Sequence, residues 1–199
     1  MKPALIIFIK NPIPGHCKTR LAKSIGDEKA LAIYRKLLRH TRKIATLNNI
    51  KTYLYYDSFI DKQDYWSNKQ FEKRLQSSGD LGQRMHAAFE EILALHKTAV
   101  IIGSDCPELT SEDLRMAFDL LGDYDCCIGP SYDGGYYLLG LKTLPSAFFF
   151  KDIEWSTENV MLQTLLKIKN AGLRYRKLRM LSDLDDASDL ERFPDYYTD

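Results

Sequence analysis

Short apolar runs alternate with longer segments of helical period along the chain. Runs with the length and composition of buried parallel strands cover residues 4–9, 52–56, 99–102 and 126–128. Segments with an apolar residue every three or four positions, predicted to be helices with one buried face, cover residues 27–47, 85–95, 111–121 and 157–170. This alternation predicts an α/β fold, a three-layer α/β/α sandwich with helices on both faces of the sheet.

Two later runs change the expected sheet from parallel to mixed. Residues 136–141 follow the preceding strand too closely for a helical crossover, so this run is expected to pair antiparallel. A last strand is predicted near residues 174–181, with a terminal helix starting near Asp186. No repeat, linker or low-complexity segment interrupts the pattern, so we expect a mostly parallel mixed sheet in a single domain spanning residues 1–199.

The net charge and the cysteine content limit the classes of partner and the cellular compartment expected for this chain. Because 28 Lys and Arg residues meet 27 Asp and Glu, the net charge is +1, and no overall field steers the chain onto nucleic acid or anionic lipid. The four cysteines lack metal-binding spacing, which favours reduced thiols in a cytoplasmic protein. The first apolar run is too short for a signal peptide or a membrane span.

The loop after the first strand carries a candidate phosphate site. Pro14 and Gly15 restrict its backbone shortly before Lys18 and Arg20. A lysine point charge beside a bidentate arginine suits a diphosphate, and both can stabilise a phosphate leaving group. Cys17 stands where a Walker A loop requires glycine. The alternative interpretation is an exposed basic turn that leads into a helix.

Asp105 closely follows the fully apolar run at residues 99–102, with only Gly103 and Ser104 between them. Ligands of open α/β sheets collect at the carboxyl ends of strands, where a carboxylate can hold Mg²⁺ or Mn²⁺ while substrate phosphates complete the shell. The alternative is that Asp105 only caps the turn before Pro107.

Further along, Gly79, Asp80 and Arg84 mark either a capped helix start or a second anion contact at a helix N-terminus. The segment from Asp133 through Gly134 and Gly135 is a turn between strands that also permits close approach of a ligand.

Tyr136 and Trp155 offer faces for stacking, although aromatic residues beside strands belong more often to the core. The cluster Asp183, Asp185 and Asp186 is either a second metal contact, with Asp185 as the ligand, or the cap of a terminal helix.

Taken together, these blocks resemble the bacterial DUF2064 proteins, a glycosyltransferase-like family similar to enzymes of the GT-A, nucleotide-diphospho-sugar transferase fold. The resemblance rests on ordered blocks at residues 12–21, 79–85, 103–107, 129–136, 155–157 and 183–190. It implies a mixed sheet of about seven strands, a bound nucleotide and Asp105 in the place of the GT-A metal ligand. Asp186 departs from the family, which commonly has Thr at this position. The block at residues 12–21 also resembles the basic loop of 2-phospholactate guanylyltransferase.

Two reactions suit these residues. In glycosyl transfer, Lys18, Arg20 and a divalent metal stabilise the departing nucleoside diphosphate of a nucleotide sugar, Asp133 is the candidate base, and an acceptor lies near Gly134, Gly135, Tyr136 and Trp155. In nucleotidyl transfer, a phosphorylated small molecule attacks a nucleoside triphosphate and releases pyrophosphate. A nucleotide-sensing module without catalysis is the third interpretation. None of the three involves nucleic acid.

Overall fold

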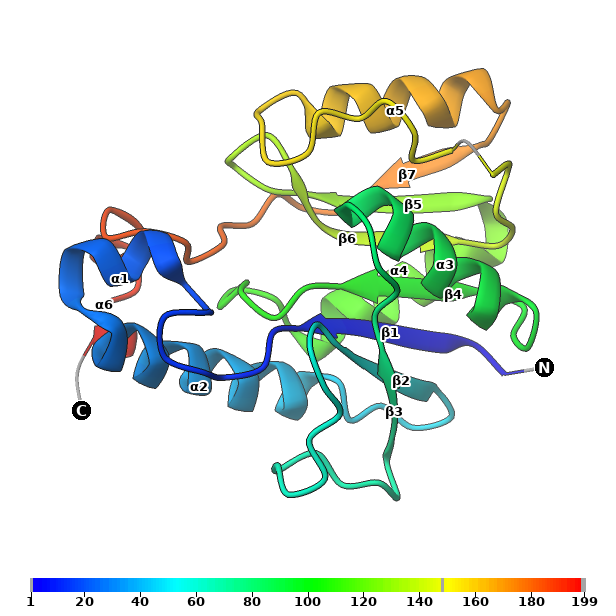
Figure 1. The fold of residues 1–199 in the computed structure, drawn as a ribbon. Helices are drawn as coiled ribbons and strands as arrows, with labels where there is room; N and C mark the ends of the chain where they lie inside the picture. Colours follow the sequence, from blue (N-terminus) through cyan, green and yellow to red (C-terminus); the bar gives the residue numbers. More distant parts are fainter. Residues whose placement is uncertain (1, 148, 198–199) are drawn as a thin grey trace.

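The structure is a computed structural model that describes residues 2–147 and 149–197 (Figure 1). The strands of the described part are β1 (Ala4–Ile9), β2 (Lys51–Tyr56), β3 (Phe71–Leu75), β4 (Ala99–Ile102), β5 (Cys126–Pro130), β6 (Tyr136–Leu141) and β7 (Tyr175–Lys177). The helices are α1 (Thr19–Ile25), α2 (Asp27–Ile44), α3 (Leu81–Leu93), α4 (Ser111–Asp123), α5 (Val160–Asn170), the 3₁₀ helix η1 (Asp189–Glu191) and α6 (Pro194–Tyr197).

The strands form one mixed sheet of order β3-β2-β1-β4-β6-β5-β7. Only β6 runs against its neighbours, β4 and β5, among the strands that the structure describes. The other strands therefore end at the same edge of the sheet, where the turn from β5 into β6 also lies. This carboxyl edge is where ligands of open α/β sheets collect.

Alternate residues of the central strands face opposite layers, as the pleat of a strand requires. Leu5 and Ile7 of β1 pack in the core cluster that contains α2 and α4 side chains, whereas Ala4 and Ile6 pack with α3 and α5. The three-layer sandwich and its mixed sheet are therefore confirmed. The C-terminal segment returns to pack near α2, beside the end of the sheet that carries α1 (Figure 1).

The structure corrects several element boundaries. Strand β3 and helix α1 were not predicted; β3 is an edge strand with polar, half-exposed residues, and α1 is too short to show a helical period. Helix α5 begins at Val160 rather than at residue 157, and β7 covers only part of residues 174–181. In place of one helix from Asp186, the terminal segment forms η1 and then α6.

The described cysteines are all buried and free, as the sequence predicted. Within residues 2–147 and 149–197, the structure contains no helix long and apolar enough to cross a membrane.

Candidate functional site

A cleft of about 510 Å³ opens at the carboxyl edge, between the loops that follow β1, β2 and β4. Lys18, Arg20, Arg84, Ser104 and Asp105 line it, which brings together residues from three separate sequence blocks. Its volume lies in the range of small-ligand sites. A second cavity of about 280 Å³ adjoins it and shares Arg20, Asp133 and Asp185 with it.

The β1–α1 loop delivers Lys18 to the floor of this cleft. His16 donates its backbone N–H to the carbonyl of Ile13, and Gly15 and Lys18 both have left-handed backbone conformations, with φ of 75° and 48°. Helix α1 starts immediately after Lys18. Pro14 and Gly15 shape the turn but do not line either cavity.

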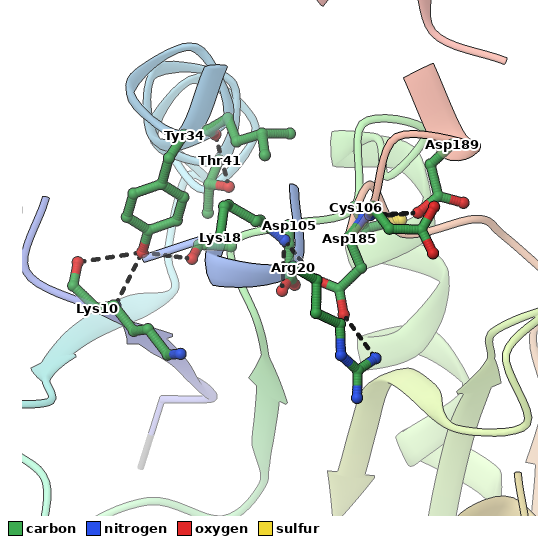
Figure 2. A network of polar contacts seen from close by, with 12 residues as sticks. Lys10, Lys18, Arg20, Tyr34, Thr41, Asp105, Cys106, Asp185 and Asp189 are labelled. Atoms are coloured by element: carbon green, nitrogen blue, oxygen red, sulfur yellow. Dashed lines mark hydrogen bonds and ion pairs between the residues drawn. The ribbon is translucent and has the colours of Figure 1, made fainter. Parts of the chain in front are cut away.

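The Lys18 ammonium lies between two carboxylates (Figure 2). Its Nζ is 3.2 Å from Asp105 Oδ2 and 2.8 Å from Asp185 Oδ1, and its side chain is only 4% exposed. Burial alone would lower the pKa of Lys18, but the charges of Asp105 and Asp185 outweigh it and raise that pKa. Burial would likewise raise the pKa of Asp185, yet Lys18 holds it below its usual value. Lys18 and Asp185 are therefore both charged at neutral pH.

The alternative interpretation of this loop, an exposed basic turn, describes Arg20 but not Lys18. The Arg20 side chain is 65% exposed, and its guanidinium lies 3.8 Å from Asp185 Oδ2. Lys18 is buried because the C-terminal segment, 167 residues further along the chain, folds over it. Sequence spacing carries no sign of that contact.

Backbone hydrogen bonds hold the two carboxylates together. The N–H of Leu184 donates to the carbonyl of Asp105 at 2.9 Å, which fixes the C-terminal segment against the β4 loop. Asp189 accepts the backbone N–H groups of Asp185 and Asp186. Asp186 itself is exposed and accepts from Ser188, so it caps this turn and does not line the cleft.

Asp183 is the most buried carboxylate of the cluster. Burial raises its pKa to about 8, and the nearby negative charges of Asp105 and Asp133 add to the effect. Its Oδ1 atom is buried without a hydrogen-bond partner among the described residues. A pKa of about 8 keeps this carboxyl mostly protonated at neutral pH, and a cation bound nearby would favour its ionised form.

These residues fit a divalent cation. Asp105 and Asp185 supply hard oxygen ligands on the cleft wall, and the unpartnered oxygen of Asp183 lies in the same acidic cluster. No group of three His, Cys, Asp or Glu side chains within the described chain forms a complete metal site by itself. Substrate oxygens would therefore have to complete the coordination shell, as is usual for Mg²⁺ bound with phosphates.

At the far end of the cleft, Arg84 projects from the first turn of α3. Its Nε donates to the carbonyl of Asp80, and its guanidinium donates to Gln76 Oε1 at 3.1 Å. The Asp80 carboxylate instead caps α3 by accepting the N–H of Gln83, and neither Gly79 nor Asp80 lines the cleft. The helix-cap interpretation of this block is therefore the one that the contacts support.

Sequence reasoning missed two polar residues of this end, Asp57 and Gln76. Gln76 is buried and donates to the carbonyls of Ile9 and Tyr55, so it ties β1 and β2 to the β3 end. Asp57 accepts the N–H of Asn11 and also lines the cleft. Asp57 directly follows an apolar strand, the same signal that identified Asp105, whereas Gln76 follows the strand that was not predicted.

Ser104 lines the cleft, but its hydroxyl lies 3.2 Å from the hydroxyl of Tyr34 on α2. Tyr34 also accepts the N–H of Lys10. Ser104 therefore helps to join the β1 and β4 loops, and it is more deeply buried than Asp105.

The second cavity contains the block predicted to face an acceptor. Asp133 Oδ1 accepts from the Ser131 hydroxyl and from the N–H of Gly135, which fixes the carboxylate at the mouth of this cavity. Gly135 and Trp155 line the cavity, whereas Gly134 packs behind it against the backbone of Glu158.

Tyr136 lines both cavities, but its hydroxyl donates to Met85 Sδ in the core. Trp155 packs against Phe150, with ring centroids 6.4 Å apart. Both aromatic side chains thus serve the core as well as the cavity wall.

Comparison with known proteins gives a family match. The model of a family described as "Uncharacterized protein conserved in bacteria (DUF2064)" matches residues 40–157. No curated protein matches the chain significantly.

Solved structures share the fold along nearly the whole chain. A candidate nucleotide-diphospho-sugar transferase from Desulfovibrio desulfuricans G20 is 29% identical, with a TM-score of 0.83 over 92% of this chain and 82% of that chain. A CMP:2-keto-3-deoxy-manno-octonic acid synthetase complexed with CTP is 11% identical, with a TM-score of 0.58 over 97% of both chains. Rv0371c from Mycobacterium tuberculosis H37Rv, in complex with manganese, is 11% identical, with a TM-score of 0.54 over 96% of this chain and 97% of that one.

These matches assign the fold to the nucleotide-diphospho-sugar transferase type, as the sequence resemblance implied. The Desulfovibrio protein supports a transferase related to nucleotide sugars, and the two more distant structures carry the fold alone.

Proposed function

The chain belongs to the bacterial DUF2064 family, and we propose that it is a metal-dependent glycosyltransferase that moves a sugar from a nucleotide sugar to a hydroxyl group of a small-molecule acceptor. The first cavity would hold the nucleotide, and the adjoining one would hold the acceptor. Asp105 and Asp185 would hold Mg²⁺ or Mn²⁺ together with the donor's diphosphate.

The observation that carries this proposal is the charge of the acceptor cavity. Its lining includes the acidic residues Asp133, Glu158, Asp183 and Asp185, and Arg20 is the cation among the residues described there. A phosphorylated acceptor would be repelled by this surface, whereas a neutral hydroxyl group would not be. The lining therefore favours transfer to an alcohol over attack by a phosphate.

Each candidate residue has a defined role in this reaction. The metal, when bound, would neutralise charge that develops on the leaving diphosphate. Arg20, exposed at the junction of the two cavities, would donate hydrogen bonds to the same phosphate oxygens. Asp133 is held by two hydrogen bonds through Oδ1 and would accept the proton of the attacking hydroxyl on Oδ2.

The alternative is nucleotidyl transfer, in which pyrophosphate leaves a nucleoside triphosphate. The observation in its favour is that the cationic β1–α1 loop and the carboxylates would serve a triphosphate equally well. Product identity separates the two reactions.

We expect prolonged incubation with UDP-, GDP- and ADP-sugars and Mn²⁺ to release a nucleoside diphosphate, because water can replace a missing acceptor slowly in a preorganised site. Chromatography of the nucleotides measures the release, and Asp133→Asn should lower it. Pyrophosphate formed from a triphosphate and a phosphorylated compound, with no diphosphate from any sugar donor, would replace the proposal by its alternative.

Arg20→Ala should lower turnover by about 10-fold to 100-fold while the melting temperature changes by no more than about 2 °C, because an exposed side chain with a long ion pair contributes little to folding. Steady-state kinetics and thermal unfolding measure the two effects. Lys23→Ala, an exposed cation of the same helix that lines neither cavity, is the matched control and should change neither. Normal turnover in Arg20→Ala would show that Arg20 is only a surface charge and takes no part in the reaction.

A further inference from the structure

Lys18 occupies a position that a cation-binding site would be expected to keep for its metal. Its ammonium bonds one oxygen of Asp105 and one of Asp185, the two carboxylates assigned above as metal ligands. Figure 2 shows the Lys18 side chain reaching between these residues, whereas no ion pair joins Lys10 to either of them within the described chain.

The ammonium and a divalent ion compete for the same oxygens. Metal–oxygen bonds are about 2.0–2.6 Å long, so a metal held by Asp105 and Asp185 would lie within the space of the ammonium. Two positive charges at that separation would also repel each other strongly in a half-buried cluster. Metal binding at these two oxygens therefore requires the ammonium to leave.

Lys18 has room to move its side chain into the cleft. Its side chain lines the cleft, its stem has four flexible carbons, and its backbone lies at the junction of the Pro/Gly loop with α1 rather than inside a strand. Movement of the side chain alone would carry the ammonium into the cleft. In that cleft, the phosphates of a bound donor would be favourable partners for the ammonium.

Resting on the metal dependence of the proposed function, we propose that Lys18 is an internal counter-ion. It neutralises Asp105 and Asp185 in the metal-free protein, and a divalent cation displaces it toward the donor phosphates. Lys18 thereby links metal binding to phosphate binding, because its ammonium reaches the phosphates only after the metal has replaced it.

The test is the affinity for Mn²⁺ alone, measured from the paramagnetic resonance signal of free Mn²⁺ in titrations without nucleotide. Lys18→Met removes the competing charge and should bind Mn²⁺ at least about tenfold more tightly than the unmodified protein. Lys10→Met removes a cation from the same cleft that makes no ion pair with either carboxylate, and its affinity should stay within about twofold. Equal affinity in Lys18→Met and the unmodified protein would overturn the proposal and leave metal dependence standing.

A second measurement does not depend on the folding of a variant. Lys18 of the unmodified protein is almost fully buried, so an amine-reactive reagent should label it slowly. Saturating Mn²⁺ should accelerate labelling of Lys18 severalfold, read by peptide mass spectrometry, with Lys23 as the exposed reference. Continued protection of Lys18 in saturating Mn²⁺ would show a permanent structural bridge and overturn the proposal. Absence of Mn²⁺ binding to the unmodified protein and to Lys18→Met, with and without UDP, would instead remove the metal from the proposed function, and this inference with it.

Discussion

Replacing Asp105 with asparagine should reduce the release of nucleoside diphosphate from a sugar donor by about 10²-fold to 10³-fold, which corresponds to about 3–4 kcal/mol of transition-state stabilisation. The substitution keeps the shape of the side chain but removes an anionic oxygen ligand. The fold should survive, because Lys18 retains its shorter ion pair, 2.8 Å, to Asp185. We also expect the Mn²⁺-dependent thermal shift caused by nucleotide to disappear.

Asp186→Asn provides the matched control for this experiment. Asp186 belongs to the same acidic segment but is exposed, and its side chain accepts hydrogen bonds from Ser188 that an asparagine oxygen can also accept. Its turnover and its Mn²⁺ response should match those of the unmodified protein. Normal Mn²⁺-dependent turnover in Asp105→Asn would remove Asp105 from the metal site.

Gly134→Ala should destabilise the protein by about 3 kcal/mol, which for a domain of this length lowers the melting temperature by about 6–12 °C. Gly134 has a φ of 87°, a conformation that side chains with a Cβ rarely adopt. A Cβ at this position would also lie 2.3 Å from the backbone oxygen of Glu158, which cannot move without shifting the segment that leads into α5. Thermal and denaturant unfolding measure the loss.

Gly172→Ala separates the two causes. Gly172 has a similar φ of 68°, but a Cβ there would meet no atom within 4 Å, so only the conformational cost of about 1 kcal/mol remains. We therefore expect a fall of about 2–4 °C. Equal losses in the two variants would show that the Glu158 backbone yields readily and that the turn at residues 131–135 is not held tightly.

Strands β1, β4 and β6 could be predicted from the sequence to the residue. Each is an uninterrupted apolar run, because a central strand is buried on both faces and no polar residue is tolerated along it. The antiparallel direction of β6 followed in the same way from the seven residues, 129–135, between the predicted strand at 126–128 and the next run, which are too few for a crossover. Local chain geometry decides these features, so local sequence reveals them.

Strand β3 could not be predicted, because this segment becomes a strand only by pairing with β2. Glu72 and Arg74 are partly exposed at the sheet edge, and the alternation of residue types does not predict a strand there. Pairing with β2 supplies the hydrogen bonds that make this segment a strand. Gln76 directly follows β3. Because β3 was not predicted, the hydrogen bonds by which Gln76 joins β1, β2 and Arg84 were not predicted either.

The candidate site likewise has a part that the local sequence predicts and a part that depends on tertiary contacts. Lys18, Arg20 and Asp105 stand out in the sequence, because charged residues in the loops that follow apolar strands gather at the carboxyl edge of the sheet. The burial of Lys18 between Asp105 and Asp185 depends on contacts across 87 and 167 residues. Only the tertiary structure decides that contact, since it needs the C-terminal segment anchored by Leu184 on the Asp105 carbonyl. An ion pair in water contributes little, whereas the same charges interact more strongly once that segment encloses them.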